Sequence, residues 1–398
     1  MQSHPDFDAA YSGQNSFLTH EDAKTSVTST IFLGARLWNG GEVYASPELS
    51  GGDGLSGATG IAGFVNGETF RIGDPRPSVT VARIFIKQTW NLSEEYSDVS
   101  DDALQLPGRQ YASHIMLAVG KISMTDFFDV NRFSHDPRTQ FLNWALMANG
   151  AWDYPANTRG YTWGLVAEAA CFSWTVRISS AMVPTEANRS AFDDDLAHAK
   201  SETIELELPY TFAGQKGTAR VLGYYTQARM GNYREAIDAP ISGTPDVVST
   251  RAYGRTKYGF GINIEQPLAG WLGLMIRGSW NDGKNETWMF TEIDRAASSA
   301  LAFDGDAWGR AGDHAGIALV VSGLSTDHRD YLDAGGYGFL IGDGRLHYAP
   351  ETIVEAFYLV KVVETIALSG DYQFVLNPAY NIDRGPVHVF ALRAHTEF

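Results

Sequence analysis

The chain has 398 residues, with 30 Lys plus Arg against 47 Asp plus Glu, which gives a formal net charge of -17. This balance excludes a non-specific nucleic-acid binder, because such a protein needs a cationic face to neutralise phosphates. With 44% apolar and 19% charged residues the chain is no disordered acidic tail, and its single cysteine excludes an internal disulfide framework.

The hydropathy pattern excludes a second class of protein. No apolar run approaches the roughly 18 residues that a membrane-spanning helix needs, since the longest, at 315–324, is broken by Gly316, Ser322 and Gly323. The first seven residues have neither the cationic nor the apolar region of a signal peptide. We therefore expect either a cytoplasmic protein or the mature form of an exported one. A spanning β-barrel also passes this test, because its strands are short and alternate.

Alternation of apolar and polar residues, the sign of a half-exposed strand, is the main local pattern of the chain. In chain order it predicts strands at 27–37, from 79, from 114, from 161, at 172–179, 204–210, from 218, at 257–265, 272–279, from 286, from 314, from 351, from 365 and at 390–398. Helical periodicity is weak and confined to 186–200 and to a turn or two within 93–106.

The segment 257–280 shows the alternation most clearly. Tyr258, Phe260, Ile262 and Ile264 fall on one face of a strand, opposite a face that ends with Glu265. A short turn is predicted at 267–270, and the next strand again separates apolar from polar positions. The pattern predicts a hairpin with one apolar wall and one polar wall.

Such walls suit either a soluble sandwich, with the apolar face in a dry core, or a membrane barrel, with the apolar face in lipid. Three features favour the barrel. Well over ten strands are predicted without a domain break, aromatic residues stand near strand ends as in an interfacial girdle, and the polar faces carry charges of both signs. The residues concerned at the strand ends are Trp38, Trp90, Tyr210, Trp271 and Trp280.

Long polar segments separate the predicted strands. They lie at 47–78, 93–110, 125–160, 183–200, 229–252 and 324–347. Loops of this length are unusual in a compact soluble domain and suggest a function. We expect residues 1–24 to form a periplasmic or plug-like segment and residues 25–398 to form the barrel.

Several long, ordered motifs resemble the carbohydrate-selective porin family of the OprB type. They are GARLWNGGEVYASPE at 34–48, GKISMTDFFDVN at 120–131, the segments 134–141 and 143–164, residues 351–358, DYQFVLNPAYN at 371–381 and the closing strand to Phe398. The resemblance spans nearly the whole chain and is thin at 183–200 and 229–252.

This resemblance implies an all-β fold: a transmembrane antiparallel barrel of about sixteen strands with long loops partly folded into the lumen. It implies passive diffusion of mono- or small oligosaccharides across the outer membrane of a Gram-negative bacterium, and no enzyme activity. The expected partners are the sugar and outer-membrane lipid, with the chain as a monomer or a homo-trimer and no nucleic acid bound.

Sugar recognition in a water-filled channel needs hydrogen-bond donors, acceptors and aromatic rings that bind weakly enough to release the solute. On the strands, Arg83 shares a face with Phe85 and Lys87, opposite Ala82, Ile84 and Ile86. The candidate lumen residues on strands are Arg36, Trp38, Arg83, Lys87, Lys121, Glu265, Arg277 and Arg393. The segment 126–138 is the best candidate for a loop in the constriction, with Asp126, Asp129, Asn131, Arg132, Asp136 and Arg138.

Alternative functions stay open on the sequence. The cationic candidates would also suit a channel for small organic anions. A soluble carbohydrate-binding protein or glycosidase could use Glu205 and Glu207 as paired carboxylates, and a barrel enzyme would need a catalytic motif that the sequence does not show. No cofactor or catalytic residue is expected. A calcium ion at Asp53, or at Asp304 and Asp306, is a lesser alternative to surface turns there.

Overall fold

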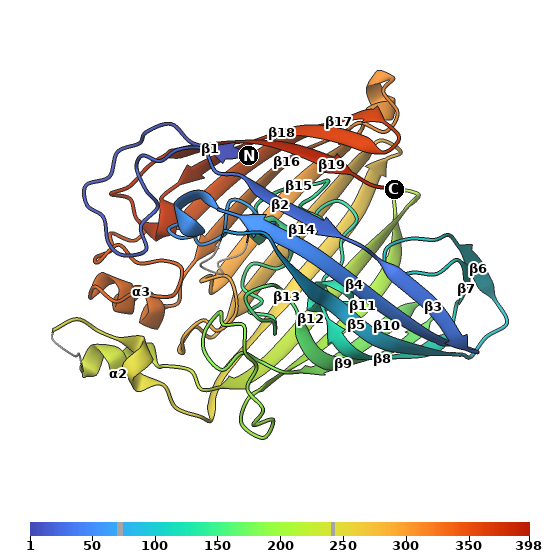
Figure 1. Ribbon diagram of the computed structural model, residues 1–398, viewed down its shortest axis with the longest axis horizontal. Coiled ribbons are helices and arrows are strands. Elements are labelled where there is room, and N and C mark those ends of the chain that lie inside the picture. Colours follow the sequence, from blue (N-terminus) through green and yellow to red (C-terminus); the bar gives the residue numbers. More distant parts are fainter. Residues whose placement is uncertain (70–74, 240–242) are drawn as a thin grey trace.

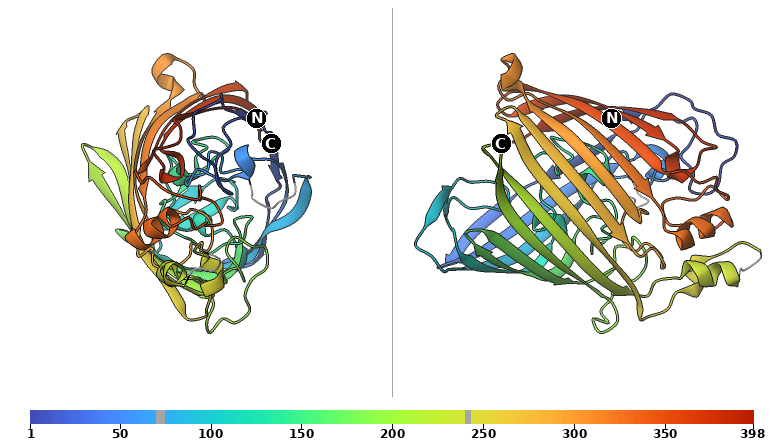
Figure 2. Two further views of the ribbon diagram at one scale, coloured as in Figure 1. Left: turned by 90° about the vertical axis from the view of Figure 1, so that its left-hand side faces the viewer. Right: turned by 180° about the vertical axis from the view of Figure 1, so that it is seen from behind.

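The computed structural model describes residues 1–69, 75–239 and 243–398. Within these residues a 17-stranded antiparallel sheet curls into a barrel, and stretches of chain run inside the ring of strands (Figures 1 and 2). The predicted all-β barrel with loops folded into its lumen is confirmed.

The strands follow one another around the wall in chain order. The first half consists of β1 (Gln2–Ser3), β2 (Ser26–Thr30), β3 (Leu33–Trp38), β4 (Gly41–Gly52), β5 (Ser78–Asn91), β8 (His114–Ile122), β9 (Thr162–Cys171), β10 (Trp174–Ala181) and β11 (Lys200–Phe212). The second half consists of β12 (Gln215–Ala228), β13 (Arg255–Ala269), β14 (Leu272–Asn281), β15 (Arg295–Asp304), β16 (His314–Gly323), β17 (Glu351–Val363), β18 (Ile366–Leu376) and β19 (Val387–Thr396).

The two edges of the sheet meet at the N-terminus. Gln2 of β1 pairs with Ala391 of β19 and forms an antiparallel bridge to Lys24, two residues before β2. Because β2 and β3 both pair with β4 and act as two parts of one strand, the 17 strands amount to 16 positions around the wall. The proposed boundary between residues 24 and 25 stays a prediction.

The two ends of the barrel differ. At the turn end, connections are as short as residues 213–214 and 364–365. A hairpin of β6 (Tyr96–Val99) and β7 (Gly108–Tyr111) projects from this end, where the C-terminus also lies (Figure 1). At the loop end lie 4–23 and the long connections that contain α2 (Tyr233–Asp238) and α3 (Thr326–Asp333). Exposed Trp38, Trp90 and Trp271 stand near the turn end, as an interfacial girdle requires.

The remaining helices are short and lie in connections. They are η1 (Leu55–Gly57), η2 (Met124–Asp126), α1 (Trp144–Met147), η3 (Val247–Thr250), η4 (Gly305–Trp308) and η5 (Pro378–Tyr380). No helix among the described residues is long and apolar enough to cross a membrane.

Side-chain exposure along the wall is the reverse of that in a soluble protein. On β11, Ile204 is 54% and Leu206 is 36% exposed, whereas Glu205 is 1% and Thr203 is 3% exposed. Apolar rows therefore face outward, as hydrocarbon requires, and polar rows face a lumen. The alternative of a soluble sandwich with a sealed apolar interior is wrong.

Loops rather than wall residues supply most of the aromatic packing inside the barrel. Trp144 and Tyr154, from the connection between β8 and β9, contact Phe290 from the connection between β14 and β15, with ring centroids 4.9 and 4.8 Å away. The polar wall thus encloses an apolar cluster that the loops form inside the barrel.

Most predicted strands are confirmed, and the errors have local causes. Residues 186–200 form no helix, 93–106 contains β6, and no strand starts at Glu286, which lies in a loop where Arg251 holds its carboxylate. The turn predicted at 267–270 shrinks because β13 continues to Ala269. Parts of the predicted loops 47–78 and 229–252, at 70–74 and 240–242, lie outside the described residues.

The predicted orientation of one side chain on β5 is also wrong. Ala82 was expected on the outer face with Ile84, yet it is fully buried. The register shifts between Ser46 and Pro47 of the partner strand β4, so that Ala82 is an extra residue in the ladder. Such a bulge re-aims the side chains around it, and Arg83 still faces the lumen.

Candidate functional site

The connection between β8 and β9, residues 123–161, runs inside the barrel and is held by carboxylates of β11, β13 and β17. Glu205 of β11 accepts the Asp129 amide at 2.7 Å, and Glu265 of β13 accepts the Arg132 amide at 3.1 Å. Glu355 of β17 accepts two further amides, one of them at 3.0 Å. Buried backbone N–H groups need acceptors, and the wall supplies them where this in-folded loop has no ladder of its own.

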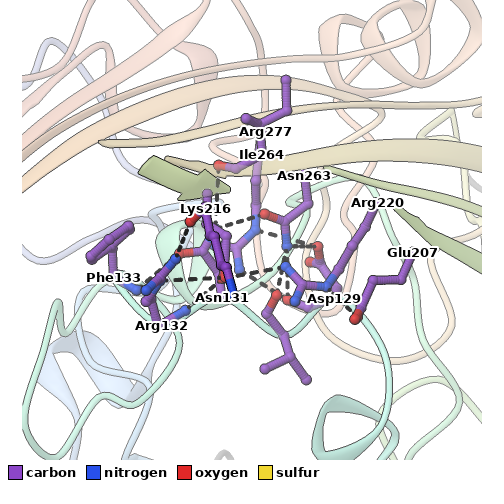
Figure 3. A network of polar contacts seen from close by, with 12 residues as sticks. Asp129, Asn131, Arg132, Phe133, Glu207, Lys216, Arg220, Asn263, Ile264 and Arg277 are labelled. Carbon is purple, nitrogen blue, oxygen red and sulfur yellow. Dashed lines mark hydrogen bonds and ion pairs between the residues drawn. The ribbon is translucent and has the colours of Figure 1, made fainter. Parts of the chain in front are cut away.

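A buried network reinforces this attachment (Figure 3). Arg277 of β14 donates to the Asp129 carbonyl at 3.0 Å, and its Nε lies 3.4 Å from the Asp129 carboxylate. Asn263 of β13 donates to the same carboxylate at 2.7 Å and accepts from Asn131 at 2.7 Å. All of these side chains are buried, so the network fixes the loop rather than facing solute.

On the opposite side, the in-folded loop faces the wall formed by β2, β4, β5 and β8 across a belt of polar groups, some part-exposed and some buried. Arg83 of β5 binds Asp126 in a bidentate pair, with Nε and Nη2 at 2.6 and 2.7 Å from its oxygens. Because a guanidinium has five N–H donors, three remain for other partners. The side chains of this pair are 14% and 15% exposed.

Arg138, from the tip of the in-folded loop, forms the second part of the belt. Its guanidinium lies 3.1 Å from Glu68 and 3.5 Å from Glu48, and it donates to Thr30 at 3.0 Å. Burial opposes its charged form, but the two carboxylates outweigh this effect and raise the pKa of Arg138. Arg138 is therefore a permanent cation in the belt.

Tyr161 joins these two parts. Its hydroxyl donates to Glu48 at 2.9 Å, and its ring lies 5.1 Å from the Arg83 guanidinium and 5.8 Å from the Lys121 ammonium. Arg159 donates to hydroxyls of both β4 and β5, at 2.8 and 2.9 Å. Exposed Phe32 adds a ring on the far side of Arg83, at 5.9 Å.

The belt combines the kinds of group that a hydroxylated sugar ring can bind. It comprises Phe32, Glu48, Glu68, Arg83, Lys121, Asp126, Arg138, Arg159 and Tyr161. Its cations donate hydrogen bonds, its carboxylates accept them, and the exposed ring of Phe32 offers an apolar face.

The other candidate residues are not members of the belt. Lys87 pairs with Glu42 at 2.9 Å, and Arg36 reaches a backbone carbonyl of the β5–β8 connection near the turn end. Trp38 donates to Gln88 at 2.6 Å. Asp136 accepts the Arg138 amide at 3.0 Å. Arg393 donates to Ser369 at 2.7 Å and to the carbonyl of residue 137 of the in-folded loop.

Sequence reasoning therefore placed Arg83, Lys121, Asp126 and Arg138 among the lumen candidates but missed five members of the belt. Glu48 had a usable signal, since it alternates with outward Leu49 on β4. Tyr161 and Arg159 follow an irregular loop whose path no periodicity predicts, and Glu68 lies in a second such loop.

The described residues hold no cluster of three or more His, Cys, Asp or Glu side chains suited to a metal ion. Asp304, one of the calcium candidates, pairs with His314 at 3.0 Å instead. Glu205 and Glu207, the carboxylates of the glycosidase alternative, both pair with Arg177, at 3.1 and 2.9 Å.

Comparisons with known proteins agree with this architecture. The structure resembles one described as the high pH structure of Pseudomonas putida OprB, at 14% identity and a TM-score of 0.73, covering 100% of this chain and 94% of that one. The trimer form of OmpT, an outer membrane protein of Vibrio cholerae, aligns at 13% identity and a TM-score of 0.46, covering 94% and 91%. No protein with a curated description matches. A family model described as carbohydrate-selective porin, OprB family, matches residues 29–398, and the chain therefore belongs to that family of outer-membrane sugar porins.

Proposed function

We propose that mono- and small oligosaccharides cross the barrel by passive diffusion past the belt between the in-folded loop and the wall of β2 to β8. The observation that carries this proposal is the meeting of part-exposed Arg83 and Arg138 around buried Tyr161, which brings donors, acceptors and an aromatic ring together. The chain performs this transport without an enzymatic step.

Weak, multiple contacts suit this task better than one tight site. Arg83, Arg138 and Arg159 already bind a carboxylate or a hydroxyl of the protein, and Lys121 donates to the Val81 carbonyl. A sugar hydroxyl therefore exchanges one hydrogen bond for another. A net hydrogen bond of about 0.5–1.5 kcal/mol retains the solute briefly and lets it leave, as conduction requires.

A small organic anion remains a second candidate solute because of the charges of the belt. Arg83, Lys121, Arg138 and Arg159 are cationic, against carboxylates at Glu48, Glu68 and Asp126. This excess of one cation attracts anions, although the whole chain is strongly acidic.

Replacing Arg83 with Ala tests the proposal. The variant is expected to weaken glucose block of single-channel current about tenfold, because it removes charged hydrogen-bond donors and one side of the Tyr161 contact. Arg109→Ala is the matched control, since Arg109 also lies over an aromatic ring, Tyr96 at 4.3 Å, but in the hairpin outside the lumen.

The same recordings decide between the two solutes. Glucose block that is weakened in Arg83→Ala and unchanged in Arg109→Ala supports the sugar proposal. Wild-type current that glucose leaves unaltered while a dicarboxylate blocks it contradicts the proposal and favours the anion channel. Chemical cross-linking in detergent distinguishes a monomer from a homo-trimer.

A further inference from the structure

A separate cavity opens at the turn end of the lumen, below the belt. Its volume is about 490 Å³, within the range of roughly 300–1,000 Å³ that is typical of small-molecule sites. It is lined by the tip of the in-folded loop on one side and by β15 to β19 on the other. None of the residues that line it belongs to the belt, so we treat it as a distinct space, the turn-end vestibule.

Small inward residues explain why the wall is hollow here. Ala302 on β15 and Ala367 on β18 occupy inward positions where larger side chains would reach into the lumen. Phe133 packs over Gly273 of β14, where an added Cβ would lie 2.1 Å from its ring. The loop tip therefore fits the far wall closely but leaves the β15 to β19 side open.

The lining has two kinds of surface. Phe133, Phe357 and Leu359 provide apolar contacts, and Gln140, Arg132 and Lys361 provide polar groups. The Lys361 side chain has no ion pair among the described residues. Half-exposed Arg132 lies 5.0 Å over the Phe133 ring and 3.4 Å from the Glu265 carboxylate. An apolar floor beside the unpaired Lys361 ammonium matches a hydroxylated ring with one apolar face.

The charges favour a neutral ligand. Arg132 is paired with Glu265 outside the lining, and Lys361 shares the lining with the carboxylates of Asp304, Glu364 and Glu397. A free anion or cation would therefore meet a like charge as well as an opposite one, whereas sugar hydroxyls can use both donors and acceptors.

We propose that the turn-end vestibule is a second binding site for a neutral sugar of one or two rings, in series with the belt. This inference rests on the proposed function, because it assumes that sugar crosses the belt. The site holds solute that has passed the belt, or that enters from the turn end.

Two sites in series predict that, in planar lipid bilayers, changes in the vestibule alter sugar block of the current from one side only. Sugar added at the turn end reaches the vestibule directly, whereas sugar added at the loop end must first cross the belt. Lys361→Met, which keeps the stem that packs on Gly312, is expected to weaken maltose block from one side about threefold to tenfold. Ala367→Trp, which fills the cavity, should weaken the same one-sided block at least as much.

Lys216→Met is the control, because it removes the same charge at the same end of the lumen. Lys216 does not line the vestibule. One-sided weakening in both vestibule variants, absent in Lys216→Met, supports the site. Unchanged block, or equal weakening from both sides, overturns it while leaving the belt proposal intact. A wild-type channel that maltose and glucose block from neither side overturns the proposed function together with the vestibule.

Discussion

Replacing Arg277 with Ala is expected to lower the free energy of unfolding by about 3–5 kcal/mol, because it leaves the Asp129 carboxylate buried without its cation. The guanidinium also donates to the Leu146 carbonyl at 2.6 Å, so the change detaches the in-folded loop from β14 at two points. Denaturant unfolding in lipid vesicles, followed by tryptophan fluorescence, measures the loss. Single-channel current should become noisier as the loop moves.

Two further variants separate the unpaired charge from the loss of the side chain. Arg277→Met combined with Asp129→Asn should recover much of the stability, since uncharged groups of similar volume can replace a buried ion pair. Arg310→Ala, which removes an exposed arginine paired with Asp313, should change unfolding little. Equal stability of Arg277→Ala and wild type would show that this network does not hold the loop.

Placing a charge on the outer wall should have the second large effect. Ile262 lies at the middle of β13, is exposed, and stands between Val221 and Gly278 on the neighbouring strands. Ile262→Arg is expected to lower the free energy of unfolding by about 2–4 kcal/mol, the range for an arginine at the midplane of a bilayer. The same vesicle unfolding experiment measures it.

Val248→Arg is the matched control for this change. Val248 is also an exposed branched aliphatic residue, but it lies in η3 at the loop end, outside the wall. Its substitution should be tolerated because water solvates the guanidinium there. If both arginine variants unfolded at the same denaturant concentration, the outer row of β13 would not face hydrocarbon.

The wall could be predicted from sequence because alternation alone fixes which residues share a face. The rows of β13 and β14 around Ile262 and Arg277 appear in the structure as the pattern predicts. Alternation does not say which face is wet, since sandwich and barrel share it. Side-chain exposure in the structure shows it, because Glu205 is buried and its neighbour Ile204 is exposed.

The interior was less accessible to sequence reasoning. Asp129 and Arg138 lie nine residues apart in one loop, and both were reasonable candidates for the constriction. The structure buries Asp129 in the network with Arg277 and places Arg138 in the belt. This division depends on which wall carboxylates accept the loop amides, and those contacts join residues more than 70 positions apart. No local pattern encodes them.

Swelling of vesicles that contain the purified protein tests the central claim most directly, namely that the polar rows line a water-filled passage for sugars. Vesicles that enclose impermeant dextran are diluted into a solution of glucose, maltose or a larger oligosaccharide that is isotonic with their interior. Rapid swelling in glucose, slower swelling in maltose and little swelling in the larger sugar are expected, together with slower glucose entry in Ala367→Trp. Vesicles with correctly folded protein that swell no faster in glucose than protein-free vesicles would contradict the account.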